Sequence, residues 1–399
     1  MKELSKIALA IQPSTTLAID SMFKQMKAEG QDVVGFGAGE PDFPTPDYIK
    51  EAGIEAIRNN DTKYTPSVGT VEVRKAVCQR LKEDCGIEYQ PAEIAVSNGA
   101  KTCVYASLRA LVNPGDEVIL PAPYWVSYIE LIQMVGGVPV VVNATEAEHF
   151  KITPEKLAAA ITPKTKCMIL NNPSNPTGMM YDRQELEAIA KVCVEKDIYV
   201  ISDEIYYRLA YDGREFTSLA AISPEIKERT LIVNGVSKSY AMTGWRVGYL
   251  AAPKMIADAV NSIQSHTTSN PNSIAQYASV AALTDPQGEG FLSGMREAYD
   301  ERRRYMVEKI NSIEGLSCNE PKGAFYVFVN VRELLGKTYK QFRLHDAIDL
   351  AQYMLDEGVA VVPGNAFGAD DHIRLSYAIS LEDIQEGLNR IERFVKLLK

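Results

Sequence analysis

Short apolar runs rich in β-branched residues recur along the middle of this chain, and longer amphipathic stretches separate them. A short continuous apolar run is typical of a strand that is buried on both faces of a sheet. The stretch 183–196 has the spacing of an amphipathic helix. This alternation predicts an α/β domain in which helices cover a parallel sheet. The predicted strands are 117–120, 138–142, 167–170, 199–202 and 230–233.

The chain has 399 residues, which is enough for a large buried core and a second lobe. From about residue 288 the pattern changes to long charged helical stretches, one apolar strand at 324–329 and a last helix at 381–399. This part of the chain is typical of a smaller α+β lobe. We therefore expect two lobes with a site between them.

Composition and charge limit the possible partners. A net charge of -10 gives no general attraction for nucleic acid or for an anionic membrane, so we expect neither as a partner. No apolar run approaches the roughly 18 residues of a membrane span, and the first ten residues lack a signal-peptide core, so the cytoplasm is the expected compartment. The six cysteines form no C-x-x-C pair and the four histidines have no metal-ligand spacing, which predicts reduced thiols and no metal site.

Two segments partly match nucleotide-binding motifs, but each lacks a required glycine. The glycines at 35, 37 and 39 would need a third motif glycine at position 40 for a dinucleotide fingerprint, but Glu40 stands there and Pro41 follows. The segment 336–338 resembles the end of a phosphate-binding loop, but Val331 occupies the place of its first glycine. Dehydrogenase and kinase functions are therefore disfavoured.

A lysine and an aspartate follow two of the predicted strands. Lys238 comes shortly after the strand 230–233, and Asp203 directly follows the strand 199–202. Ligands of α/β sheets bind beyond the carboxyl ends of strands, so both side chains are candidates for one site, although Lys238 alone could be a surface cation. A pyridoxal cofactor needs a lysine for its aldehyde and a carboxylate facing its ring nitrogen. These two residues supply both groups.

Eight motifs in order give the chain a resemblance to the class I (fold type I) aminotransferases, and within them to the bacterial aspartate aminotransferase branch. The resemblance spans nearly the whole length. The motifs lie at 37–43, 63–66, 97–101, 123–128, 172–178, 203–206, 237–249 and 373–378. The resemblance implies a large domain with a mostly parallel seven-stranded sheet between helices and a smaller α+β domain. It divides the chain into an N-terminal arm with part of the small domain (1–47), a large cofactor-binding domain (48–287) and a small C-terminal domain (288–399).

The same resemblance implies that pyridoxal 5'-phosphate is bound as a Schiff base to Lys238, which then moves the proton between the substrate α-carbon and the cofactor. Asp203 would pair with the ring nitrogen, and Tyr206 and Asn175 would hydrogen-bond the ring oxygen. Trp125 would stack on the ring and contact the substrate; alternatively it is a core or interface aromatic.

The family pattern also assigns the phosphate site. The backbone at Gly99, Ala100 and Lys101 would donate to the phosphate at a helix start, with the Ser237 hydroxyl and the Arg246 guanidinium. Tyr64 is expected to reach the phosphate of the other subunit, which makes the active site a property of a homodimer.

Arg374 is expected to hold the substrate α-carboxylate, assisted by Gly39 and Asn175. The place of the distal arginine of animal-type enzymes is taken by Ser265. The branch resembled here instead uses the lysine at Lys101, with hydroxyls from the segment 13–16, of which Ser14 and Thr15 are the predicted contacts. We expect this segment to close over the substrate. The alternative for Lys101 is a phosphate-facing or solvated lysine.

The predicted reaction moves the amino group of L-aspartate to 2-oxoglutarate, giving oxaloacetate and L-glutamate. Prephenate ranks below aspartate because Gln12 replaces the lysine of the prephenate-using members, and a neutral aromatic or aliphatic amino acid stays possible. A pyridoxal-dependent β-lyase on the same fold also stays open, because elimination shares the carbanion. A pyridoxal-binding transcription regulator is disfavoured, because the motifs leave no room for a DNA-binding domain.

Overall fold

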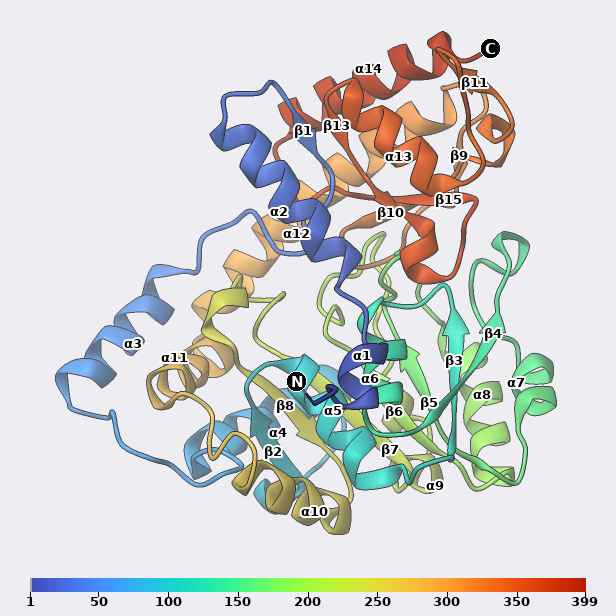
Figure 1. Cartoon of the computed structure of the whole chain (residues 1–399). Coiled ribbons are helices and arrows are strands. Elements are labelled where there is room, and N and C mark those ends of the chain that lie inside the picture. The colour runs from blue at the N-terminus through green and yellow to red at the C-terminus, as the bar shows by residue number, and fades with distance from the viewer. Residues whose placement is uncertain (1) are drawn as a thin grey trace.

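The computed structural model describes residues 2–399 and is built around a seven-stranded sheet (Figure 1). The strand order is β2-β8-β7-β6-β5-β3-β4, and only β8 runs in the direction opposite to the other strands. The mostly parallel sheet expected from the sequence is confirmed. The strands are β2 (Ile94–Ser97), β3 (Glu117–Ala122), β4 (Val138–Asn143), β5 (Thr165–Asn171), β6 (Tyr199–Asp203), β7 (Thr230–Gly235) and β8 (Gly248–Ala251).

All five strands predicted from apolar runs are present, and two others were not predicted. The missed strands, β2 and β8, have only four residues each, too few for a clear pattern. The apolar run of β4 is not buried on both faces, because β4 is the last strand of the sheet; Val138 is 45% exposed and Val141 is 43% exposed.

Helices cover both faces of this sheet. Leu231 and Val233 point into one apolar cluster and Ile232 into another, as the two-residue period of a strand requires. The predicted helix at 183–196 is confirmed as α8 (Arg183–Glu195). One face packs against α5 (Ala100–Leu111), α6 (Ser127–Met134) and α10 (Lys254–Ser265); the other packs against α4 (Val71–Cys85), α7 (Pro154–Ala160), α8, α9 (Pro224–Lys227) and α11 (Ser273–Thr284), with α3 (Asp47–Arg58) against α11.

The C-terminal part forms a second lobe, shown in orange and red in Figure 1. Its four-stranded sheet has the order β14-β15-β10-β9, with β10 and β15 antiparallel. The strand expected at 324–329 begins two residues later, because Ala324 has a φ of +59° and cannot extend the strand. The elements are α12 (Gln287–Asn311), β9 (Ser317–Cys318), β10 (Tyr326–Asn330), β11 (Thr338–Tyr339), β12 (Phe342–Arg343), α13 (Ala347–Asp356), β13 (Val359–Ala360), β14 (Val362–Pro363), β15 (His372–Ser376) and α14 (Leu381–Leu397).

Part of the N-terminal segment also joins the second lobe. The segment contains α1 (Lys6–Ala10), α2 (Thr15–Ala28) and β1 (Val34–Gly35). Strand β1 pairs in parallel with β13, so residues more than 300 positions apart lie side by side. This pairing supports the proposed division of the chain near residues 47 and 287, which stays a prediction.

Short 3-10 helices complete the described part of the chain: η1 (Pro91–Glu93), η2 (Glu146–Glu148), η3 (Leu219–Ala221), η4 (Thr243–Trp245), η5 (Arg332–Leu334) and η6 (Gly364–Phe367). Within residues 2–399, no helix has both the length and the hydrophobicity needed to cross a membrane. The same residues contain no group of three His, Cys, Asp or Glu side chains arranged to hold a metal ion.

The start of α5 depends on a close backbone contact with β8. A methyl group added at Gly248 would lie 2.2 Å from the nitrogen of Ala100 and 2.5 Å from the carbonyl carbon of Gly99. Both neighbours are backbone atoms, so they can yield only if the helix start moves.

We predict that Gly248→Ala lowers the free energy of unfolding by about 1–3 kcal/mol, because the new methyl group overlaps fixed backbone. Gly290→Ala is the matched control: it lies in α12, meets no atom within 4 Å and is expected to stabilise the protein by roughly 0.5–1 kcal/mol through helix propensity. Urea denaturation of both variants measures the difference. Equal stabilities would contradict the close-contact account.

Candidate active site

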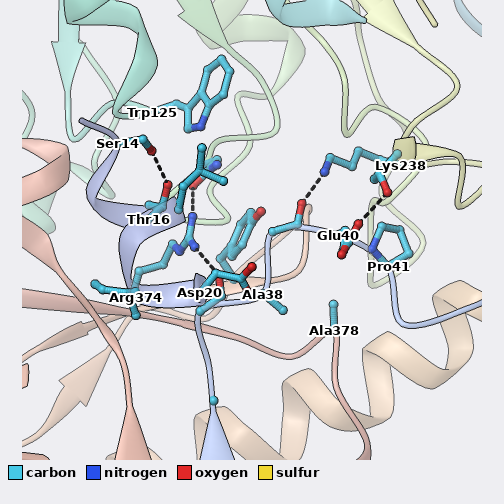
Figure 2. A pocket seen from close by; sticks show the side chains of 18 of the residues that line it. Ser14, Thr16, Asp20, Ala38, Glu40, Pro41, Trp125, Lys238, Arg374 and Ala378 are labelled. Carbon is cyan, nitrogen blue, oxygen red and sulfur yellow. Dashed lines mark hydrogen bonds between the residues drawn. The ribbon is translucent and has the colours of Figure 1, made fainter. Parts of the chain in front are cut away.

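A cavity of about 680 Å³ lies where the carboxyl ends of the central strands meet the second lobe. Its walls come from strand ends (Asn171, Asp203), the start of α5, the N-terminal segment and the second lobe (Tyr326, Arg374). Figure 2 shows Ser14, Trp125, Lys238 and Arg374 around this cavity, although they come from four separate parts of the chain. This is the place at which α/β sheets bind ligands.

Asp203 ends β6 and is buried in the floor of the cavity. The hydroxyl of Tyr128 donates to its carboxylate at 2.6 Å, and the backbone N–H of Ile205 donates at 3.2 Å. Burial raises the pKa of Asp203 to about 6, and these two donors and Lys238 oppose the rise. A carboxylate held in this way is fixed in position and suited to pair with a cationic ligand atom.

Lys238 follows β7 and lines the same cavity. The parallel strands β6 and β7 are neighbours, with Asp203 opposite Val233, so the expectation that the two strand ends face one site is met by the geometry. Nζ of Lys238 donates to the carbonyl oxygen of Gly39. Burial lowers the pKa of Lys238 to about 8, while the charge of Glu40 opposes this. The amine is therefore partly neutral, and nucleophilic, near physiological pH.

Arg374 is the most deeply buried cation of the cavity, with 2% of its surface exposed. Nη1 donates to Oδ1 of Asn175 at 3.0 Å and Nη2 donates to the carbonyl oxygen of Gly37 at 3.1 Å. Its Nε has no partner, and in residues 2–399 no carboxylate lies within ion-pairing distance of the guanidinium. Burial lowers the pKa of Arg374, but an arginine keeps its charge in proteins. The described residues of the site therefore supply no acidic partner for this buried positive charge.

Lys101 and Trp125 form a second wall. Nζ of Lys101 lies 4.8 Å from the centre of the Trp125 ring, and the Trp125 and Tyr128 rings meet edge to face with centroids 5.2 Å apart. Desolvation, and then the charge of Arg246, lower the pKa of Lys101. The described residues supply no acidic partner for Lys101.

The predicted phosphate-binding residues gather at the start of α5. Ala100, Lys101, Ser237 and Arg246 line the cavity. Gly99 precedes the helix with a φ of +87° and packs against the Arg246 guanidinium, where a methyl group would lie 2.3 Å from Nη2. The positive φ and the close guanidinium favour glycine at this position. Gly99 therefore shapes the predicted phosphate site without lining the cavity.

Of the predicted substrate and partner contacts, some reach the cavity and others do not. Ser14 lines it, and its Oγ lies 3.0 Å from Oγ1 of Thr16, which also lines it. Thr15, the first residue of α2, is not among the lining residues. Tyr64 is 90% exposed and lies outside the cavity. The remaining predicted contacts all line the cavity: Gly39, Trp125, Asn175, Asp203, Tyr206, Lys238 and Arg374.

Two tyrosines of the site were not assigned a role from the sequence. Tyr128 donates to Asp203, and its position three residues after Trp125 was the available signal, because both then face one side of a helical turn. Tyr326 begins β10, and its hydroxyl lies 3.0 Å from that of Tyr206. Nothing in the local sequence marks Tyr326, because its partners are distant along the chain.

Comparisons with known proteins agree with this geometry. Residues 31–391 match the family described as aminotransferase class I and II. The chain is 47% identical over 398 residues to an aspartate aminotransferase of Geobacillus stearothermophilus (99% of each chain), and 46% identical to an aspartate/prephenate aminotransferase of Cereibacter sphaeroides (99% of each chain).

Solved structures give the same result. An aspartate aminotransferase from Rhizobium meliloti superposes with a TM-score of 0.96 at 40% identity, covering 100% of both chains. The Thermus thermophilus aspartate aminotransferase with maleate gives 0.93 at 40% identity, covering 99% of this chain and 100% of the other. The family expected from the sequence motifs is therefore confirmed: the chain belongs to the class I and II aminotransferases and is an enzyme with aminotransferase activity.

Proposed function

We propose that this enzyme transfers the amino group of L-aspartate to 2-oxoglutarate, giving oxaloacetate and L-glutamate, with pyridoxal 5'-phosphate held at Lys238. One observation carries the proposal: Arg374 is a buried cation whose protein partners are all neutral. An uncompensated buried charge is costly, so the site favours a ligand that brings a carboxylate. Every amino acid and 2-oxo acid has one.

The side chains that line the cavity match the chemical groups of the cofactor. Lys238 offers an amine of lowered pKa, and Asp203 offers a fixed carboxylate for the ring nitrogen. The phosphate would be held by the start of α5 with Ser237 and Arg246, the ring oxygen by Asn175 and Tyr206, and the ring face by Trp125. When bound, pyridoxal 5'-phosphate supplies an electron sink for the pair of electrons left at the substrate α-carbon.

The protein then has three tasks. Arg374 and Asn175 fix the α-carboxylate, which sets the direction of the Cα–H bond. With Oδ1 of Asn175 turned to Arg374, the amide N–H groups of Asn175 stay available as donors. Lys238 removes the proton from Cα as a general base, which its lowered pKa favours. The N-terminal segment with Ser14 limits the access of water.

Selectivity for aspartate is proposed to come from Lys101. Its ammonium lies on Trp125 in the same cavity as Arg374, so the two cations can take the two carboxylates of one dicarboxylic substrate. Gln12 is neutral, and its amide donates to the carbonyl oxygen of Ala10, which supports ranking prephenate below aspartate. The relative from Geobacillus stearothermophilus is named for aspartate alone and the one from Cereibacter sphaeroides for aspartate and prephenate, so aspartate is common to both.

A homodimer is proposed because Tyr64 is exposed and lies outside the cavity of its own chain. Exposed apolar side chains accompany it on nearby stretches of the sequence: Ile54, Ile57 and Val71. Exposed apolar side chains favour a protein partner, and a second copy would let Tyr64 reach the other phosphate site. The cytoplasmic location stays a prediction.

The pKa of the Lys238 amine sets its reactivity. Because only a neutral amine reacts with acetic anhydride, acetylation of Lys238 in the cofactor-free protein should rise with pH and reach half of its maximal rate near pH 8. Lys24 is the internal reference: its bond to Asp20 raises its pKa, so its midpoint should lie higher. Peptide mass spectrometry measures both rates. A midpoint for Lys238 above pH 10 would contradict the burial effect.

Lys101 is expected to set the preference for an acidic substrate. Lys101→Ala should lower kcat/KM for aspartate by roughly 10- to 150-fold, which is the effect of losing a charge-assisted hydrogen bond. The kcat/KM for alanine as a substrate should be nearly unchanged, because alanine has no second carboxylate. Rapid mixing of the holoenzyme with each amino acid follows the change in cofactor absorbance. Lys24→Ala is the control, because Lys24 lines the same cavity but is already paired with Asp20 at 2.7 Å.

Other outcomes separate the remaining functions. Faster conversion of a neutral amino acid than of aspartate by the unmodified enzyme would discard the aspartate assignment and keep the aminotransferase activity. Release of pyruvate and ammonia without the pyridoxamine form would indicate a β-lyase.

A further inference from the structure

Tyr326 occupies a junction of the active site. It begins β10, is 1% exposed and lines the cavity. Its hydroxyl lies 3.0 Å from that of Tyr206, and the two rings meet edge to face with centroids 5.8 Å apart. The hydroxyl pair is buried, and a hydrogen bond is electrostatically stronger in such surroundings than in water.

The ring of Tyr326 has a second partner. The Arg374 guanidinium lies 4.4 Å from the ring centre, a distance typical of a cation–π contact. Strands β10 and β15 pair antiparallel, which holds the two side chains at fixed positions on neighbouring strands. One tyrosine therefore contacts both the arginine proposed for the α-carboxylate and the phenol proposed for the cofactor ring oxygen.

The number of hydroxyl hydrogens determines which tyrosine is the donor in the hydrogen bond between Tyr326 and Tyr206. A phenol has one hydrogen to donate. If Tyr206 donates to the ring oxygen of the cofactor, the hydrogen between the two tyrosines must come from Tyr326. Burial raises the pKa of Tyr326, so this hydrogen is present at physiological pH. Donation into the Tyr206 oxygen strengthens the donation that Tyr206 makes in turn.

We propose that Tyr326 is a positioning residue of this enzyme: its hydroxyl donates to Tyr206 and thereby directs the Tyr206 proton at the cofactor, and its ring supports Arg374. The proposal rests on the proposed function, because it assumes that pyridoxal 5'-phosphate and a carboxylate substrate occupy the cavity. It assigns a separate task to each half of one side chain, and the two tasks can be tested apart.

The hydroxyl is tested by Tyr326→Phe, Tyr206→Phe and the double variant. The measurement is the pH midpoint of the visible absorption change of the holoenzyme. Hydrogen bonds to the ring oxygen favour its anionic form and lower this midpoint, so each single variant should raise it. Tyr326→Phe should raise the midpoint by roughly half a pH unit, and Tyr206→Phe by more. The double variant should match Tyr206→Phe, because the Tyr326 hydroxyl acts only through Tyr206.

Tyr299→Phe is the matched control. Tyr299 belongs to the same aromatic cluster, with its ring 5.7 Å from Phe325, and its buried hydroxyl has no hydrogen-bond partner among the described residues. Its removal should leave the midpoint unchanged.

The ring is tested by the binding of succinate to the holoenzyme. Tyr326→Phe keeps a ring beneath Arg374 and should bind succinate within about twofold of the unmodified enzyme. Tyr326→Leu removes the ring and should weaken binding roughly tenfold. Thermal unfolding of each variant shows whether it is folded.

An unchanged pH midpoint in Tyr326→Phe would overturn the proposal. So would a double variant whose midpoint lies above that of Tyr206→Phe by the full shift seen for Tyr326→Phe alone. The proposed function would survive either result, provided that the unmodified enzyme binds pyridoxal 5'-phosphate and converts aspartate. An unmodified enzyme that takes up no cofactor would overturn both.

Discussion

The structure of the active site depends on one buried charge, the guanidinium of Arg374. Removing a cation from water without a counter-ion costs several kcal/mol, so the surrounding fold must hold it in place. Three distant parts of the chain do so: β15 carries the side chain, Asn175 approaches from a loop after β5, and Gly37 approaches from the N-terminal segment. The two lobes and the N-terminal segment therefore meet at the group that is proposed to bind the substrate.

Burial also sets the charges of the two groups assigned to the cofactor, and it acts on them in opposite directions. It lowers the pKa of Lys238 to about 8, which favours a neutral amine, and raises the pKa of Asp203 to about 6, which disfavours its anion. Since an aspartate in the unfolded chain titrates near 3.9, the folded protein holds this proton more tightly. The contribution of Asp203 to stability is therefore present at low pH and is lost as the pH rises through about 6. A cationic ring nitrogen beside Asp203 would offset this loss, which links cofactor binding to stability.

The sequence allowed much of the fold and part of the site to be predicted, for identifiable physical reasons. Apolar runs marked β3 to β7, and the position of Lys238 and Asp203 after neighbouring strands placed both at one site. The strands β2 and β8 were too short to show a period, and the positive φ of Ala324 that delays β10 is invisible in composition. Tyr128 and Tyr326 were missed because their roles come from contacts across 75 and 120 residues of sequence. Ser14 and Thr15 were assigned together, but neighbouring residues at a helix start point in different directions, and Thr16 lines the cavity instead of Thr15.

Arg374 and Lys101 are proposed to bind the two carboxylates of one dicarboxylic substrate. A crystal structure of the holoenzyme with succinate tests this proposal most directly, because it locates both carboxylates at once. We expect one carboxylate to make a bidentate contact with the Arg374 guanidinium and the other to lie within hydrogen-bond distance of Nζ of Lys101. A succinate bound through Arg374 with its second carboxylate turned to solvent or to another cation would contradict the account and remove Lys101 from substrate recognition.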